Sequence, residues 1–286
     1  MPYKHLKTAR DGGVERLVLN RPEARNALND EVIAELIDWA DAVRKSGDVR
    51  VVVLAGAGKT FSAGADVGWM ARTIEHSRAE NMRDASAFSR MFVALDTLPV
   101  PVVGRVQGGA LGGGAGLAAV CDIVVAEDRT VFGFTEVRLG IVPAVISPFV
   151  LSKIGQSAAR ELFLTGARFS AERAREIGLV HLVVAPEALD EAVEATVRDL
   201  LLAPPEAIAT AKGLISDVGK ASPGDVHALT ARVIAARRVS AEGQEGLRAF
   251  LEKREPRWVV DGEWPRRETS NPLAQGPRAP GTDKLR

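Results

Sequence analysis

The chain has 286 residues, of which 46% are hydrophobic, which is enough for one large domain or for one domain with a small cap. Its 37 Lys and Arg balance its 37 Asp and Glu, and this neutrality argues against a general nucleic-acid-binding protein, which needs a basic excess. The single cysteine, Cys121, excludes an internal disulfide and a cysteine-rich metal site, so we expect a reducing compartment.

Membrane and secretory segments are not expected either. The N-terminal sequence MPYKHLKTAR has no apolar stretch of the secretory type. The longest mostly apolar run, 111–126, contains four glycines and Asp122 and is a poor membrane span. We therefore expect a soluble, cytoplasmic protein.

The first half of the chain alternates strand and helix patterns. Two β-capable runs flank the turn Asp11-Gly12-Gly13, as in a hairpin. The expected strands are 3–9, 14–19, 49–56, 101–108 and 121–127. The expected helices are one that begins at Asn29 or Asp30 and ends at Gly47, a polar one over 78–97, and one that follows a glycine-rich loop within 109–120. Continuous apolar strands separated by helices predict an α/β core with much parallel pairing.

Helical patterns dominate the second half. The expected helices are 147–154, 157–165, 170–177, 186–202, 204–218, 223–239 and 241–254, with one short strand at 179–184. The stretch after Pro256 is rich in proline and charge, and we expect it to be irregular and held by Trp258 or Trp264.

Two glycine-rich segments resemble nucleotide-binding loops only superficially. VVVLAGAGKT (51–60) ends like a phosphate-binding loop, but Val53 stands where that loop needs its first glycine and no helix pattern follows. Gly114 to Ala119 matches a loose dinucleotide fingerprint, with Glu136 twenty residues after Gly116. The preceding strand, however, ends near Val106, too far upstream for that site. We expect neither loop to bind a nucleotide in this way.

Metal and nucleophile sites are not predicted. The four histidines are scattered without ligand spacing, and Cys121 has apolar neighbours typical of a small buried residue. What remains is two glycine-rich turns, 61–66 and 110–116, whose bare backbone allows a ligand to approach closely. Two converging N–H groups from these turns would form an oxyanion hole; the alternative is that both are only tight turns.

Several segments, taken together, resemble a known family. These are NRPEARNAL (20–28), GKTFSAGAD (58–66), QGGALGGGAGLAAVCDIVVA (107–126), FGFTEVRLGIVP (132–143) and GQEGLRAFLEKREPRW (243–258). In order and interval they resemble the signature segments of the enoyl-CoA hydratase/isomerase, or crotonase, superfamily over about residues 3–258. The resemblance implies an α/β spiral of ββα repeats over 1–200, a C-terminal helical region over 201–258 and an irregular tail over 259–286. It also implies homotrimers or hexamers.

The resemblance further implies the site. A CoA thioester would bind with its carbonyl oxygen between the backbone N–H groups of Ala63 and Gly113, which stabilise an enolate-like transition state. The residues implied around the acyl-CoA are Ala24, Asn26, Ala27, Leu28, Gly64, Ala65, Asp66, Gly112 and Gly116. No metal or redox cofactor is expected, because CoA arrives as part of the substrate.

Glu136 matches one of the two glutamates that the family's hydratases usually carry, and Gly116 follows the glycine run where the other is expected. We predict reversible hydration of a 2-enoyl-CoA, with Glu136 as acid and base acting through a water in the space left by Gly116. A single carboxylate also resembles the family's Δ3-Δ2-enoyl-CoA isomerases. A non-catalytic acyl-CoA-binding homologue is the third alternative, and Glu136 would then be a structural carboxylate, for example paired with Arg138.

One segment of the sequence bears on the acyl group of the substrate. AVISPFVL (144–151) replaces the family's frequent glycine-rich run and resembles the branch assigned to methylglutaconyl-CoA hydratases. A distal carboxylate on the substrate would need a basic partner, for which Arg72, Arg83 and Arg138 are candidates.

Overall fold

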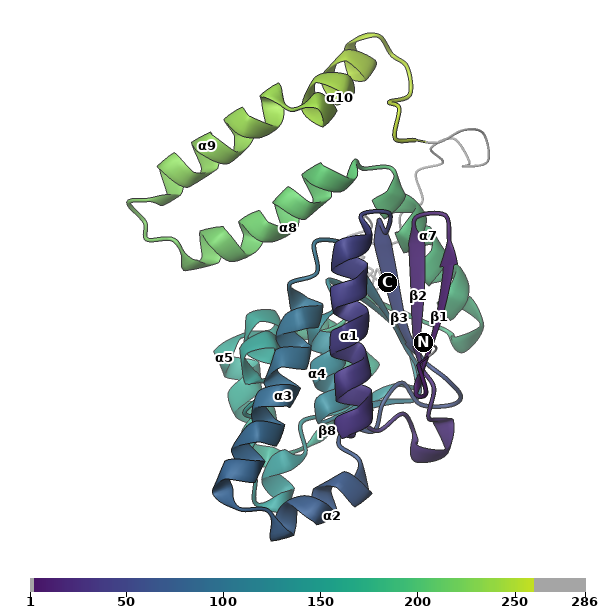
Figure 1. Cartoon of the computed structure of the whole chain (residues 1–286), viewed down its shortest axis with the longest axis vertical. Coiled ribbons are helices and arrows are strands. Elements are labelled where there is room, and N and C mark those ends of the chain that lie inside the picture. Colours follow the sequence, from purple (N-terminus) through teal and green to yellow (C-terminus); the bar gives the residue numbers. More distant parts are fainter. Residues whose placement is uncertain (1–2, 260–286) are drawn as a thin grey trace, which may run out of the picture.

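A computed structural model describes residues 3–259, and its main feature is a six-stranded sheet (Figure 1). The strands lie in the order β1 (Leu6–Asp11), β2 (Val14–Leu19), β3 (Val51–Gly56), β4 (Val102–Val106), β6 (Ile123–Glu127) and β9 (Leu182–Val184). The β1–β2 pair is the antiparallel hairpin predicted around Gly12, and every other neighbouring pair is parallel. The predicted α/β core with parallel pairing is therefore confirmed.

Both faces of this sheet are covered, which explains its continuous apolar strands. One face packs against α1 (Asp30–Ser46), α3 (Arg78–Asp96) and α4 (Gly113–Val120), and Leu54 belongs to that core. The opposite face packs against α7 (Leu189–Leu201), with Val53 among the buried residues. Because side chains alternate between faces along a strand, all six residues of β3 are buried.

A second, three-stranded sheet was not predicted. It consists of β5 (Gly109–Leu111), β7 (Val131–Gly133) and β8 (Arg168–Ser170). The segment 109–112 was expected to be a loop and 170–177 a helix; the helix α6 (Ala171–Glu176) begins just after β8. Strands of three residues are too short for an alternating pattern, so the sequence carried no signal for them.

The remaining helices of the core differ in small ways from expectation. α2 (Val67–Glu75) was not predicted, although Asp66 caps it. α5 (Ser147–Thr165) is interrupted at Gly155, whose φ of 68° and ψ of 173° agree with the predicted break between 154 and 157. Short 3-10 helices occur at Pro22–Ala24, Glu136–Leu139 and Pro186–Ala188. Within the described residues no helix is both long and apolar enough to cross a membrane.

The C-terminal helices α8 (Pro205–Lys220), α9 (Val226–Val239) and α10 (Ala241–Leu251) stand apart from the core (Figure 1). Polar contacts tie this unit to the core. Arg50 donates to the carbonyl oxygens of Leu201 at 2.7 Å and Ala203 at 2.8 Å. The predicted attachment through Trp258 is confirmed, because its indole N–H donates to Leu202 O at 3.0 Å. The other candidate, Trp264, and the predicted tail from residue 260 onward lie outside the described residues.

Candidate functional site

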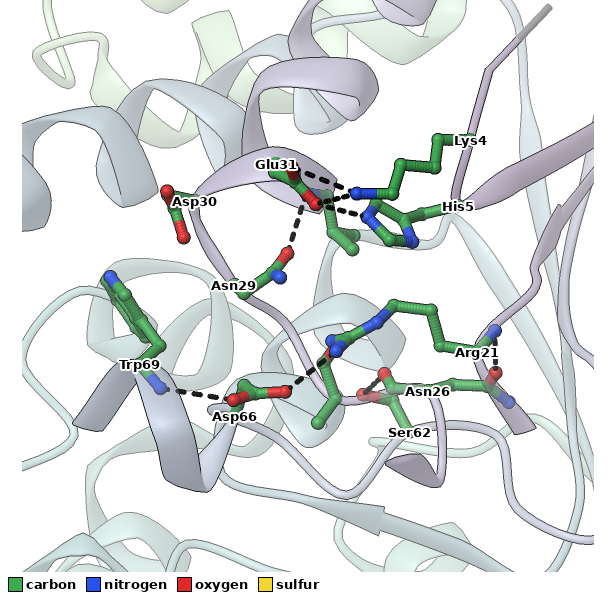
Figure 2. Close-up of polar contacts among 12 residues, drawn as sticks. Lys4, His5, Arg21, Asn26, Asn29, Asp30, Glu31, Ser62, Asp66 and Trp69 are labelled. Carbon is green, nitrogen blue, oxygen red and sulfur yellow. Dashed lines mark hydrogen bonds and ion pairs between the residues drawn. The ribbon is translucent and has the colours of Figure 1, made fainter. Parts of the chain in front are cut away.

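The loop before α1 is held by a buried asparagine, Asn26 (Figure 2). Its side-chain oxygen accepts from Arg21 N at 2.9 Å, and its amide donates to Ala57 O at 2.8 Å and Thr60 O at 2.7 Å. Asn26 is 2% exposed and adopts a left-handed φ of 54°. Its side chain therefore joins the first loop to the segment after β3, and its place around the ligand stays a prediction.

The Asp66 side chain also forms contacts within the protein. One carboxylate oxygen accepts from Trp69 N at 3.1 Å, which caps α2, and the other lies 2.9 Å from Arg21 Nη2 (Figure 2). Burial raises the pKa of Asp66, but the Trp69 N–H and the Arg21 guanidinium outweigh it, so the pKa is below its usual value. The charged carboxylate thus fixes the start of α2 beside the predicted CoA path.

The segments singled out in the sequence converge in space. Leu28 N donates to Gly64 O at 2.7 Å and Asp66 N donates to Leu28 O at 2.9 Å, which joins the first loop to 64–66. Ser62 pairs with Ala110 in β5, with Leu111 N donating to Ser62 O at 3.1 Å. The turn 61–66 therefore lies between the first loop and the start of α4. Of the first-loop residues predicted around the ligand, Ala27 and Leu28 are buried and Ala24 is half-buried.

The N–H donors of the turn 61–66 differ from the prediction by two residues. Ala63 N donates to Arg25 O at 2.9 Å, so the predicted role of Ala63 in an oxyanion hole is corrected. Within residues 3–259, the N–H of Ala65 has no hydrogen-bond acceptor. Since the turn bends at Gly64, whose φ is 91°, Ala65 rather than Ala63 presents a free donor.

The second free donor is at the N-terminus of α4. Gly113 is the first residue of this helix, so its N–H has no intrahelical acceptor. A Cβ built on Gly64 would lie 3.3 Å from Gly113 N, which places the turn directly beside the helix. The helix dipole and these N–H groups favour negative charge at this point. Ala65 and Gly113 are thus two free N–H donors on neighbouring segments.

Glu136 lies next to these donors. A Cβ built on Gly112 would be 3.3 Å from Glu136 Oε1, while Oε2 is buried and has no hydrogen-bond partner in the described part of the chain. Burial raises the pKa of Glu136 above its usual value. The alternative of an ion pair with Arg138 is not observed, because Arg138 Nε donates to Thr165 O at 3.2 Å. A buried carboxylate with an unsatisfied oxygen can accept a proton from a ligand.

Gly116 does not adjoin space for a water molecule. A Cβ at this position would lie 2.3 Å from Ile146 Cγ2 and 3.0 Å from Phe92 Cζ. Both side chains are buried, at 2% and 0% exposure. The expectation of a water beside Gly116 is therefore wrong, because two apolar side chains fill that place.

Phe92 belongs to an aromatic wall that the sequence did not reveal as part of the site. The rings of Trp69, Phe88, Phe92 and Phe149 contact one another in series, with centroids 5.0 to 5.8 Å apart. A Cβ on Gly113 would lie 2.8 Å from Phe88 Cζ, so this wall borders the donor pair. The spacing of Phe88 and Phe92, four residues apart on a predicted helix, was the available signal.

The basic candidates for a distal carboxylate lie on the surface and contact other groups. Arg72 contacts Asp30 at 2.7 Å, Arg83 lies 3.9 Å from Glu80, and Arg138 contacts the Thr165 carbonyl. Cys121 is buried as expected, and burial raises its thiol pKa to about 12, which makes it inert as a nucleophile.

Comparison with known proteins identifies the family. A family model described as enoyl-CoA hydratase/isomerase matches residues 9–261. The chain belongs to the enoyl-CoA hydratase/isomerase family. The predicted membership of the crotonase superfamily, the predicted spiral α/β fold with a helical C-terminal region, and the predicted class of enzyme, a hydratase or isomerase, are confirmed.

Solved and curated members of the family match nearly the whole chain. An enoyl-CoA hydratase of Shewanella pealeana superposes with a TM-score of 0.86 at 38% identity, covering 90% of this chain and 96% of that one. A crotonyl-CoA hydratase of Syntrophomonas wolfei is 30% identical over 91% of this chain and 99% of its own length. A trans-2-decenoyl-[acyl-carrier-protein] isomerase of Streptococcus mutans is 29% identical over 91% of this chain and 99% of its own. Both chemistries therefore occur among its relatives.

Proposed function

We propose that this protein hydrates a 2-enoyl-CoA reversibly, with Glu136 as the only acid and base. The thioester oxygen binds the N–H groups of Ala65 and Gly113, which stabilise the enolate-like charge of the transition state. Glu136 takes a proton from water as the oxygen adds to the β-carbon, and returns it to the α-carbon. CoA enters as part of the substrate, and no other cofactor is needed for these steps.

The observation that carries this proposal is the unsatisfied Glu136 Oε2 next to two unsatisfied N–H donors. A buried polar atom without a partner is costly, and such atoms concentrate where a ligand supplies the missing contact. The segment 144–151, which resembles that branch of the family, supports a branched acyl group of the methylglutaconyl type as the preferred substrate.

The second candidate is isomerisation of a 3-enoyl-CoA to the 2-enoyl-CoA. It is favoured by Gly116, which supplies no second carboxylate and against which Ile146 and Phe92 pack. One carboxylate suffices to remove a proton from one carbon and return it to another, whereas hydration also requires a positioned water.

Product mass separates these candidates. The purified chain is incubated with crotonyl-CoA, 3-methylglutaconyl-CoA and 3-hexenoyl-CoA, and the products are analysed by mass spectrometry. We expect a gain of one water with at least one 2-enoyl-CoA, and the fastest rate with the methylglutaconyl substrate. An unchanged mass with a moved double bond, seen with 3-hexenoyl-CoA alone, would establish isomerisation. Binding of all three thioesters without turnover would favour a non-catalytic acyl-CoA-binding protein.

We also propose that the protein acts as a homotrimer or hexamer. Large apolar side chains are exposed on all three C-terminal helices: Ile215 at 79%, Val239 at 78%, Phe250 at 80% and Leu251 at 77%. Large apolar side chains that are exposed in one chain are often buried in an interface between chains. We expect light scattering to give three or six times the mass of one chain, and Phe250→Glu to lower that mass; a monomeric wild type would contradict the proposal.

A further inference from the structure

The N-terminal turn of α4 carries the features that distinguish this site. Gly112 is the residue before the helix and Gly116 lies one turn further on, with Gly116 N donating to Gly112 O at 3.0 Å. Glu136 borders the first glycine, with Oε1 3.3 Å from the Cβ that Gly112 lacks. Ile146 borders the second, with Cγ2 at 2.3 Å and Cβ at 3.0 Å from the corresponding point on Gly116.

We propose that Ile146 is a specificity-determining residue. Its side chain occupies the place into which an acid on α4 would project, and it thereby restricts the site to proton transfer through Glu136. This inference rests on the proposed function of Glu136. On this inference, Ile146 controls the ratio of hydration to double-bond isomerisation.

The aromatic rings beside Ile146 also disfavour a carboxylate at position 116. Phe92 Cζ lies 3.0 Å from the Cβ position of Gly116, and the Phe92 ring contacts Phe88 on one side and Phe149 on the other. A carboxylate at position 116 would face methyl and ring carbons, which donate no hydrogen bonds and disfavour the ionised form. The wall therefore excludes a second acid by its polarity as well as by its volume.

A melting cycle tests the packing. We expect Gly116→Ala to lower Tm by about 3–10 °C, because the added methyl group overpacks a buried site. In the Ile146→Ala background the same change should lower Tm by no more than about 2 °C, since the obstructing methyl groups are gone. Ile33→Ala is the matched control, because Ile33 is equally buried at 2% but lies on α1, and it should leave the cost of Gly116→Ala unchanged. Equal costs in all three backgrounds would overturn the proposal.

A product ratio tests the specificity. Ile146→Ala is compared with Ile146→Ala/Gly116→Glu on 3-hexenoyl-CoA and crotonyl-CoA, after both variants are shown to melt cooperatively. We expect the added carboxylate to raise the ratio of hydration to isomerisation at least about tenfold, and to add a second ionisation to the pH–rate profile. An unchanged ratio and profile would overturn the role of Ile146 while the wild type still turned over. No turnover by the wild type would instead overturn the proposed function, and the role of Ile146 with it.

Discussion

Replacing Glu136 with glutamine is expected to lower kcat/KM for enoyl-CoA turnover by about 10²–10⁴-fold while thioester binding stays within a few-fold of the wild type. Glutamine keeps the shape of the side chain but cannot take up a proton, and acid–base catalysis contributes this range. Initial rates on crotonyl-CoA and on the best substrate of the panel measure the loss. The matched control is Glu172→Gln, because Glu172 is an exposed carboxylate on α6 paired with Arg175 at 2.9 Å. A Glu136→Gln variant that is folded and retains full activity would contradict the assignment.

The pH dependence of the wild type provides a second readout of Glu136. Burial raises the pKa of this carboxyl. As the pH falls, Glu136 therefore takes up a proton, and stops acting as a base, at a higher pH than an exposed glutamate would. We therefore expect kcat/KM to decline on the acid side with an apparent pKa above about 4.3, the ordinary value for glutamate. A rate that stays constant down to that pH would argue that no buried carboxylate acts as the base.

Changing Gly64 to alanine is expected to lower kcat by about 10²–10³-fold, the effect of losing one oxyanion donor. The added methyl group would lie 2.5 Å from Leu111 O and 3.3 Å from Gly113 N, so the turn and the start of α4 must separate. This separation moves the N–H groups of Ala65 and Gly113 apart. The measurement is kcat and KM on the preferred enoyl-CoA, with Tm as a check on folding.

The control for this change is Gly47→Ala. Gly47 has a similar positive φ of 69°, at the end of α1, but nothing lies within 4 Å of its Cβ position. Both variants therefore share the cost of a left-handed alanine, on the order of 1–2 kcal/mol. Only Gly64→Ala should lose activity beyond the fraction that unfolds. Equal activity losses in the two variants would show that strain, rather than donor geometry, causes the effect.

Much of the fold could be predicted from periodicity and helix-ending residues. The helix from Asp30 to Ser46 follows from its apolar spacing, the Asn29 cap and the left-handed Gly47. The buried parallel strands follow from unbroken apolar runs such as that of β3. By contrast, the short strands β5, β7 and β8 depend on pairing partners that lie elsewhere in the chain. The helix α2 was missed although its cap, Asp66, directly precedes it.

The sequence by itself determined the family, the presence of Glu136 and the two glycine-rich turns, because these are local properties of residue type and spacing. Only the tertiary structure decided which N–H groups are free. Ala63 and Ala65 are two residues apart, but Ala63 donates to Arg25 O across the turn, a contact that spacing cannot reveal. The tertiary structure likewise decided what faces Gly116. A glycine in the sequence does not show which side chain packs against it. Here that side chain is Ile146, thirty residues further along the chain.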